Sequence, residues 1–375
     1  MTAKKTRIAP RGIFVTAFSV LSFALVINYS NAAIDSVKSA LSLCAQTVIP
    51  SLFPFMVISE LAVSLDAAKY IGKVLAPVFR PLFNLNEHGA AAFLLGALCG
   101  FPVGARTAVS LYERGNLDEK ELTNVLCFCN NPSSAFVISA IGVSLFGSQG
   151  FGIALYIITL ISALIIGIFL RYFFREKAAN AKEFEKGKQE EKQLGIHIFT
   201  NAVADSAGAM LTVCAFIVFF SAFLGTLNAA FEPLSAPDSV IAAIKGFFEL
   251  TAGVTHVSAN LNGEGALLLC AFVIGWSGLS VHFQIMAICK NCKISFRPYF
   301  LAKAAQGGLN ALFMCAYLRV FQPNLSFHTG TDIKAFLSIP KPWTVICLIG
   351  LVGATVALVI KKATKRNKKM DIFQR

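Results

Sequence analysis

Apolar runs long enough to cross a bilayer follow one another through most of the 375-residue chain. A membrane-spanning helix needs about 20 predominantly apolar residues. Such runs lie at 12–30, 41–64, 149–174, 198–229, 240–257, 264–289, 295–320 and 341–360. Charged residues make up only 14% of the chain, too few to cover a protein that faced water on all sides. The pattern predicts an all-α polytopic membrane protein and excludes a disordered, fibrous or small disulfide-rich secreted class.

Basic residues cluster at the two ends of the chain, which has a formal net charge of +13. Lys and Arg are enriched on the cytoplasmic side of membranes, and they bind anionic lipid head groups. We therefore expect the lipid bilayer, and not nucleic acid, to be the partner of these tails. Residues 12–30 are compatible with a cleaved signal peptide, but the length of the run and the further spans favour an uncleaved first helix.

Two stretches between the runs are too polar to span a membrane. Residues 66–83 are amphipathic, with three basic residues, and are expected to lie at the membrane interface or to re-enter the membrane. Residues 175–194 mix Lys and Glu and are expected to form a solvated linker. The single C-x-x-C, at Cys289 and Cys292, has no second ligand pair at zinc-like spacing. We expect no metal site and no cofactor.

A short motif occurs on either side of the charged linker. Residues 84–90 read N-L-N-E-H-G-A and residues 260–266 read N-L-N-G-E-G-A, so five of seven positions match at an offset of 176. The first copy continues to G-F-P-V-G at 100–104 and the second, after a one-residue slip, to G-W-S-G-L at 275–279. Repeats whose helices are interrupted by Gly or Pro at matching positions are typical of secondary transporters. The sequence therefore predicts two structural repeats with broken or re-entrant helices.

The first predicted break lies at 100–104, where Pro102 removes a backbone donor in the middle of an apolar run. Backbone groups exposed by such a break are tolerated where they line a cavity or meet a ligand. We therefore predict that the substrate contacts this stretch, with Arg106 supplying positive charge. The predicted contacts are Gly100, Phe101, Pro102, Gly104 and Arg106. The alternatives are close helix packing through the glycines, and an Arg106 side chain that reaches the membrane surface.

Polar residues interrupt two further apolar runs. Asn130 and Asn131, followed by Pro132 and Ser133, offer amide and hydroxyl groups suited to a small-molecule site, with helix-to-helix hydrogen bonding as the alternative. Glu249, in G-F-F-E-L-T, is expected to contact a coupling cation or a substrate amine, or to pair with a lysine.

The second copy of the motif completes the predicted substrate-binding set with Gly275, Ser277, Gly278 and Gln284. We leave out His282, because a single His in an apolar run is more often structural. The chain has no H-E-x-x-H, G-x-S-x-G or G-x-x-x-x-G-K-[ST] motif. We therefore expect a protein that is not an enzyme, although intramembrane chemistry stays an alternative.

Four of these motifs together resemble a known family, the YlbJ-type sporulation integral membrane proteins. They are G-F-P-V-G-A-R at 100–106, N-N-P-S-S at 130–134, G-F-F-E-L-T at 246–251 and G-W-S-G at 275–278. This family is grouped with the nucleoside-recognition Gate domains, which also occur in ferrous-iron transporters and are related to concentrative nucleoside transporters. The resemblance extends from about residue 40 to about residue 360. It implies a membrane role in spore-forming bacteria and movement of a small solute, with dipicolinate as the family-level candidate.

The resemblance and the repeat together suggest a division of the chain into five parts. The parts are an N-terminal tail with the first transmembrane helix (1–40), a first Gate-like repeat (41–174), a charged cytoplasmic linker (175–197), a second Gate-like repeat (198–320), and a last transmembrane helix with a basic tail (321–375).

Charge and repeat disagree about topology. Positive-inside counting places both termini and the linker in the cytoplasm. An even number of crossings must then separate the N-terminus from the linker, so one of the five long runs between them must be re-entrant, and we choose residues 89–112. Residues 264–289 correspond to 89–112 in the repeat. If they are also re-entrant, the basic C-terminal tail lies outside the cell. If they span the membrane, the tail lies in the cytoplasm. We favour both termini inside, with about 7–9 hydrophobic segments in all.

Our leading hypothesis is a multi-pass transporter of a bacterial cell membrane, with the forespore membrane as one location. It would move a dipicolinate-like anion or a nucleoside-like solute by alternating access of the two repeats. The coupling ion stays open. The competing hypothesis is a non-transporting membrane scaffold for spore or envelope assembly. Expected partners are the bilayer and the small-molecule substrate, with a second copy of the chain or another membrane protein left open.

Overall fold

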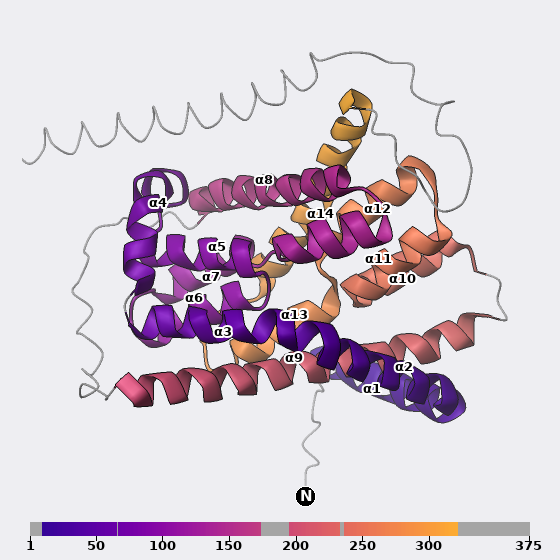
Figure 1. The fold of residues 1–375 in the computed structure, drawn as a ribbon. Helices are drawn as coiled ribbons and strands as arrows, with labels where there is room; N and C mark the ends of the chain where they lie inside the picture. The colour runs from indigo at the N-terminus through magenta and orange to yellow at the C-terminus, as the bar shows by residue number, and fades with distance from the viewer. Residues whose placement is uncertain (1–9, 66, 174–194, 233–235, 322–375) are drawn as a thin grey trace, which may run out of the picture.

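The computed structural model describes residues 10–65, 67–173, 195–232 and 236–321, and within these residues it contains helices and no strand (Figure 1). The predicted all-α fold is therefore confirmed. The N-terminal part contains α1 (Pro10–Asn28), α2 (Ser30–Leu43), a π-helix η1 (Cys44–Val48), α3 (Ile49–Ser64), α4 (Ala67–Phe83), α5 (Glu87–Cys99), α6 (Val103–Glu113), α7 (Glu119–Cys129), a second π-helix η2 (Ala135–Leu145) and α8 (Gln149–Phe173). The remainder contains α9 (Gly195–Phe231), α10 (Asp238–Phe248), α11 (Leu250–Asn260), α12 (Gly263–Trp276), α13 (Gly278–Ile288) and α14 (Arg297–Phe321).

Three helical stretches of the described residues are long and apolar enough to cross a membrane. They are Gln149–Arg171, Ile196–Phe231 and Gly263–Ile288. The bent pair Thr16–Asn28 and Ser30–Gln46, which turns by 101°, would make a fourth. The expected total of about 7–9 segments is not confirmed, because several apolar runs are divided into shorter helices. The charged stretch predicted at 175–194 and the apolar run at 341–360 lie outside the described residues.

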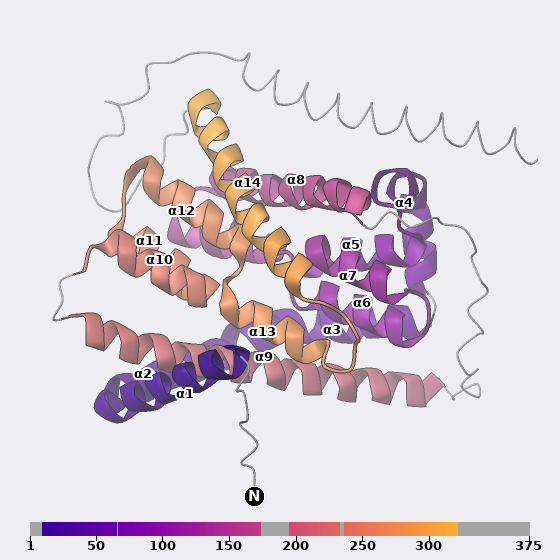
Figure 2. The same ribbon diagram turned by 180° about the vertical axis from the view of Figure 1, so that it is seen from behind.

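Two of the long helices lie on opposite sides of several shorter ones. α8 and α9 lie on opposite sides of the molecule in both views, with α5, α6, α10 and α11 between them (Figures 1 and 2). α1 and α2 lie beside α9 at one end. The apolar run 41–64 contains a π-helix, η1, immediately before α3, and Pro50 and Pro54 lie within α3.

α4 is the amphipathic helix predicted from residues 66–83. Its basic side chains Lys69, Lys73 and Arg80 are exposed, whereas Phe79 and Phe83 are buried. The ring of Phe83 stacks on Phe128 of α7 with a centroid separation of 5.3 Å. This aromatic contact packs α4 against α7, the helix that ends just before the predicted site residues Asn130 and Asn131.

α5 and α6 form an antiparallel hairpin whose tip is the predicted break. α5 ends at Cys99 and α6 begins at Val103, so the turn contains Gly100, Phe101 and Pro102. The two arms touch at Gly96 and Gly104, and a Cβ on either glycine would collide with the carbonyl oxygen of Cys129 on α7. Helix packing through small residues is therefore the role of these glycines in the arms.

α10 and α11 form a second hairpin, so the sequence-based expectation of one apolar segment at 240–257 is wrong. The chain leaves the helical conformation at Glu249, whose φ of −146° and ψ of 126° are extended. Gly253 then packs directly on Gly246, which allows the two arms to approach closely. The physical reason is that a carboxylate in mid-run caps the start of a new helix more favourably than it continues the old one.

Two other helices are interrupted without reversing. α7 is followed by η2 across Asn130–Ser133, and α12 is followed by α13 across Ser277. α12 and α13 together count as one apolar stretch, Gly263–Ile288, long enough to span. Each broken helix is followed by an unbroken helix of 25 residues, α8 in the first case and α14 in the second.

This arrangement does not support the register in which we aligned the repeat. The offset of 176 pairs α5 and α6, which form a hairpin, with α12 and α13, which form a broken helix. The matching residues 84–90 and 260–266 instead contain the starts of two helices, α5 and α12. Asn86 caps α5 by accepting from the backbone N–H of Gly89, whereas Asn262 holds the N-cap position of α12 without a side-chain cap hydrogen bond. The shared motif is thus a helix-start signal.

Candidate functional site

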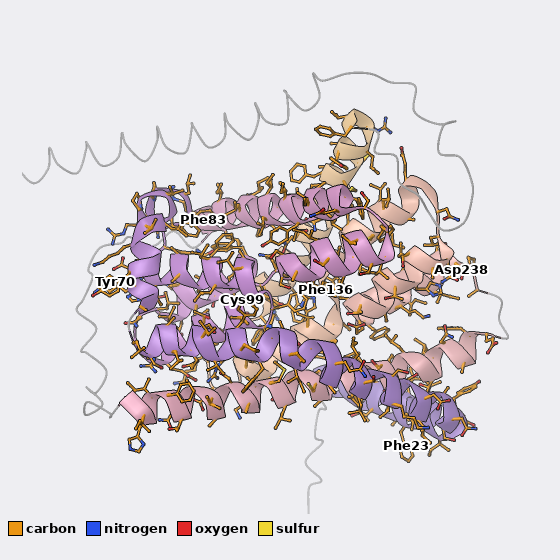
Figure 3. All side chains as sticks on the ribbon, viewed as in Figure 1. Phe23, Tyr70, Phe83, Cys99, Phe136 and Asp238 are labelled. Carbon is orange, nitrogen blue, oxygen red and sulfur yellow. The ribbon has the colours of Figure 1, made fainter. Side chains whose placement is uncertain are left out.

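A cavity of about 980 Å³ lies between the interrupted helices on one side and α2 and α9 on the other. Its wall includes the tips of both hairpins and residues from both broken helices, represented by Phe101, Pro132, Glu249 and Gln284. Phe136 of η2, which also lines it, lies near the middle of the molecule, whereas Asp238 at the start of α10 lies at its edge (Figure 3). The volume falls within the usual range for small-molecule sites.

Each hairpin tip rests on a neighbouring break through a glycine with positive φ. A Cβ on Gly100, whose φ is 83°, would lie 2.6 Å from the backbone nitrogen of Ser133. A Cβ on Gly278, whose φ is 80°, would lie 2.9 Å from the backbone nitrogen of Leu250. Glycine is needed at both positions because it alone combines this φ with so close a backbone approach.

The carboxylate of Glu249 caps the second arm of its hairpin. Its Oε1 accepts from the backbone N–H of Thr251 at 3.0 Å and its Oε2 from that of Ala252 at 2.6 Å. The positive end of the α11 dipole adds to this stabilisation of the negative charge. The N-terminal end of α11, a kind of site that favours anions, is therefore occupied by the chain's own carboxylate, and Glu249 also lines the cavity.

A basic cluster forms another part of the cavity wall. The Nζ of Lys245 lies 3.1 Å from Nδ1 of His256, and Nε2 of His256 lies 3.3 Å from a carboxylate oxygen of Asp238. Asn260 approaches the same Nδ1 at 3.2 Å. Because Lys245 has three N–H groups, its ammonium keeps donors for a solute while the imidazole is held by its neighbours.

A buried polar network lies behind the break that follows α7. The Nζ of Lys303 donates to the backbone oxygen of Asn130 at 2.9 Å and to Oε1 of Gln306 at 2.6 Å. The Nε2 of Gln306 donates to Oδ1 of Asn131 at 2.6 Å and to the backbone oxygen of Thr159 at 3.2 Å. Lys303, Gln306 and Asn131 have no exposed surface. Both predicted asparagines are thus held in the network, and they directly precede Pro132 and Ser133 in the chain.

Arg106 is not brought to the cavity. Its Nε lies 3.5 Å from Glu60 of α3, and its guanidinium also lies 3.8 Å from Asp205 of α9. Glu60 is buried and accepts a hydrogen bond from Ser110 at 2.9 Å. The predicted role of Arg106 as the charge that meets a substrate is therefore not supported by its position, which links α6 to α3 and α9.

The remaining predicted residues divide between packing and the wall. Of the fourteen, five line the cavity: Phe101, Pro132, Ser133, Glu249 and Gln284. Gly275 packs α12 on α14, because a Cβ there would lie 2.7 Å from the backbone oxygen of Gln306. Ser277, with a φ of 74°, donates to the backbone oxygen of Ile274 at 3.2 Å. Pro102 lies in the tip of the first hairpin, Gly104 packs its two arms together, and Gly278 contacts the tip of the second hairpin.

The residues that α14 contributes to the polar network were not predicted from the sequence. Lys303, Gln306 and Asn310 recur at helical spacing, so they lie on one face of the helix. Within the run 295–320, this face places a charged residue in apolar surroundings, the signal by which Arg106 was selected. Lys245 and His256 were missed for a different reason, since only the hairpin at Glu249 brings them together.

Comparison with known proteins supports the resemblance noted in the sequence. The family model Gate, described as nucleoside recognition, matches residues 45–149, which include the first hairpin and the first broken helix. The chain is 26% identical over 333 residues to the sporulation integral membrane protein YlbJ of Bacillus subtilis (strain 168), covering 80% of this chain and 81% of that protein. No solved structure matches. With its apolar helices, the chain is a multi-pass membrane protein.

Proposed function

We propose that this chain, a multi-pass membrane protein with a region that matches the Gate family model, transports a small organic anion across a bacterial membrane. The single observation that carries the proposal is the cavity, whose wall contains both hairpin tips and residues of both broken helices. Transporters place their substrate sites where interrupted helices meet, because the freed backbone groups need a polar lining or a ligand.

We further propose that the chain consists of two repeats in a register set by the breaks. Each repeat would contain a hairpin, a broken helix and a 25-residue helix, in that order. The second arms of the hairpins, α6 and α11, have 11 residues each, as have η2 and α13. α8 and α14 begin 148 residues apart, at 149 and 297. Transport would then be alternating access of one repeat against the other.

One lysine of the cavity wall, Lys245, offers a positive charge to an anion. Two carboxylates line the cavity, and both have local partners: Asp35 lies 3.5 Å from Lys38, and Glu249 caps α11. The Nζ of Lys245 bonds to the imidazole of His256, which can be neutral. No carboxylate oxygen lies within 4 Å of this Nζ in the described part of the chain. Asp238 acts on this charge electrostatically, but it lies 3.3 Å from His256 and does not line the cavity, so the ammonium of Lys245 keeps N–H donors for a solute.

A planar dicarboxylate such as dipicolinate is the solute class we propose. It is small enough for a cavity of about 980 Å³, and the apolar wall residues, such as Phe101, Phe136 and Leu250, suit the faces of an aromatic ring. The relative named for sporulation supports a role in spore formation, with the forespore membrane as the location. A nucleoside is the competing solute, favoured by the description of the Gate region and by serine hydroxyls such as Ser133 and Ser139 in the wall.

The test is uptake of labelled dipicolinate by proteoliposomes, with excess uridine as competitor. Wild-type protein is expected to show saturable uptake that uridine leaves unchanged. The variant Lys245→Gln is expected to raise KM for dipicolinate about tenfold, the effect of losing one charge-assisted hydrogen bond. Lys290→Gln, at an exposed lysine outside the wall, is the matched control.

Each other outcome has a definite meaning. Competition by uridine would move the proposal to nucleosides. Absence of uptake by correctly folded protein, with ion gradients imposed in either direction, would replace transport by the scaffold hypothesis.

A further inference from the structure

Lys303 is a fully buried lysine whose ammonium bonds to uncharged groups. Its Nζ donates to the backbone oxygen of Asn130 and to Oε1 of Gln306, and no carboxylate oxygen lies within 4 Å of it among the residues that the structure describes. A buried charge without a counter-charge is costly, and inside a membrane protein such a group is a functional hypothesis by default.

The acceptor of Lys303 lies at the C-terminal end of a half-helix. Asn130 is the C-cap of α7, where the helix stops and its last carbonyl groups lose their intrahelical partners. This end carries partial negative charge, which favours a cation. In transporters with broken helices, the C-terminal ends of half-helices and the unwound carbonyls are where coupling sodium ions or protons bind. The ammonium of Lys303 therefore stands where a coupling cation would otherwise bind.

We propose that Lys303 is the coupling site of this protein, and that its coupling ion is a proton carried on Nζ, not a sodium ion. The inference rests on the transport function proposed above. Protonated Nζ holds Asn130, and through Gln306 it holds Asn131 and α8. Loss of one proton to water leaves a lone pair on Nζ, removes the charge and weakens the bond to the carbonyl oxygen of Asn130.

The network connects this site to the solute cavity. Asn130 and Asn131 directly precede Pro132 and Ser133, which form part of the cavity wall. Movement of the break on deprotonation would therefore move the wall. An anion in the cavity would in turn stabilise the protonated form, since it supplies the missing counter-charge. Solute and proton are thereby expected to bind together.

Few ionisable groups face Lys303. Those close enough to act on it electrostatically are Cys127 and Cys129 of α7 and His282 of α13, whose ring bonds to Tyr299 of α14 at 2.9 Å. On the other two helices packed against α14, the charged residues Arg171 of α8 and Glu264 of α12 lie in the last and first turns. None of the described carboxylates is therefore placed to take over the role of Lys303.

The experiment compares downhill exchange with concentrative uptake of labelled dipicolinate in proteoliposomes. Exchange between equally loaded compartments needs no change of protonation, whereas accumulation driven by a pH gradient requires Lys303 to lose and regain its proton. Wild-type protein is expected to accumulate dipicolinate under an inward proton gradient equally well in sodium and in choline medium. Lys303→Arg, which keeps the charge but does not release it, is expected to retain exchange and to lose at least tenfold in accumulation.

Lys303→Met serves as the second variant, in case arginine does not fit the buried site. Methionine is unbranched like lysine but shorter and uncharged, so this variant is also expected to lose proton-driven accumulation. Lys290→Arg, at an exposed lysine, is the control and is expected to behave as wild type.

The outcomes separate this inference from the proposed function. Absence of exchange in wild-type protein would overturn both. Normal exchange with sodium-dependent accumulation, or proton-driven accumulation that survives in both Lys303 variants, would overturn the coupling site alone.

Discussion

Gly100 lies so close to Ser133 that a Cβ on it would approach the Ser133 backbone nitrogen to 2.6 Å. The contact joins the tip of the first hairpin to the break after α7, and both residues belong to segments that enclose the cavity. The equivalent contact in the second half joins Gly278 to Leu250. These two contacts set the position of each hairpin tip relative to a broken helix.

Replacement of Gly100 by alanine is expected to lower the free energy of unfolding by more than the cost of placing alanine at a positive φ. Positive φ costs an L-residue roughly 1–2 kcal/mol, and the collision with Ser133 adds about 1–3 kcal/mol. Gly115→Ala is the matched control, because Gly115 has a φ of 74° and nothing within 4 Å of the added Cβ. Thermal unfolding of the purified variants measures the difference. Equal unfolding temperatures would show that the tip does not rest on Ser133.

The second hairpin should be equally sensitive to an added methyl group where its two arms touch. Gly253→Ala forces α11 away from Gly246 of α10, so it is expected to cost about 1–3 kcal/mol and to reduce uptake by displacing the tip. Gly265→Ala, in the first turn of α12 where the added Cβ meets open space, should change neither quantity. Retention of wild-type stability and uptake in Gly253→Ala would argue against a closely packed hairpin.

Arg106 is expected to matter for stability and not for substrate affinity. Arg106→Ala leaves Glu60 buried without its counter-charge, which costs up to about 3–5 kcal/mol. Glu60→Gln in the same chain should restore part of the loss, while Arg80→Ala, which breaks an exposed pair with Glu87, should cost only about 0–1 kcal/mol. KM for dipicolinate should stay unchanged in Arg106→Ala. A tenfold rise in KM, with normal folding, would return Arg106 to the substrate site.

Much of the fold was predictable, because it depends on local signals. The apolar runs, the amphipathic helix at 67–83 and the interruption at Pro102 follow from periodicity and from the chemistry of proline. The direction of the chain after a break was not predictable. Gly100 and Ser277 both have positive φ, yet the chain reverses after the first and continues after the second. That difference is decided by packing, such as the contact of Gly96 with Gly104.

The candidate site was predictable only where its residues interrupt apolar runs. Asn130, Asn131 and Glu249 have this signal. Glu249 lines the cavity, and the two asparagines directly precede the lining residues Pro132 and Ser133 in the chain. Lys245 and His256 lie 11 residues apart and meet because the hairpin reverses the chain between them. Arg106 shows the limit of the reasoning, since a charge in an apolar run can serve a buried ion pair as well as a ligand.

Glu249→Gln is expected to increase the affinity for an anion. The change removes a negative charge from the cavity wall while the amide oxygen still accepts one of the two N–H groups that start α11. We expect KM for dipicolinate to fall roughly threefold and stability to fall by about 0.5–1 kcal/mol. Asp118→Asn, at the cap of α7 outside the wall, should show a similar loss of stability without the change in KM. A higher KM in Glu249→Gln would indicate that the solute is a cation or binds this carboxylate directly.

The most direct test of the central claim is to block the cavity at Ser133. In the variant Ser133→Cys, a neutral thiol-specific reagent should abolish dipicolinate uptake, and dipicolinate should protect against the modification. The same reagent should leave uptake unchanged in wild-type protein and in Lys290→Cys, an exposed control. If mass spectrometry shows the introduced thiol of Ser133→Cys fully modified while uptake continues at the wild-type rate, the cavity between the two hairpin tips is not the path of the solute.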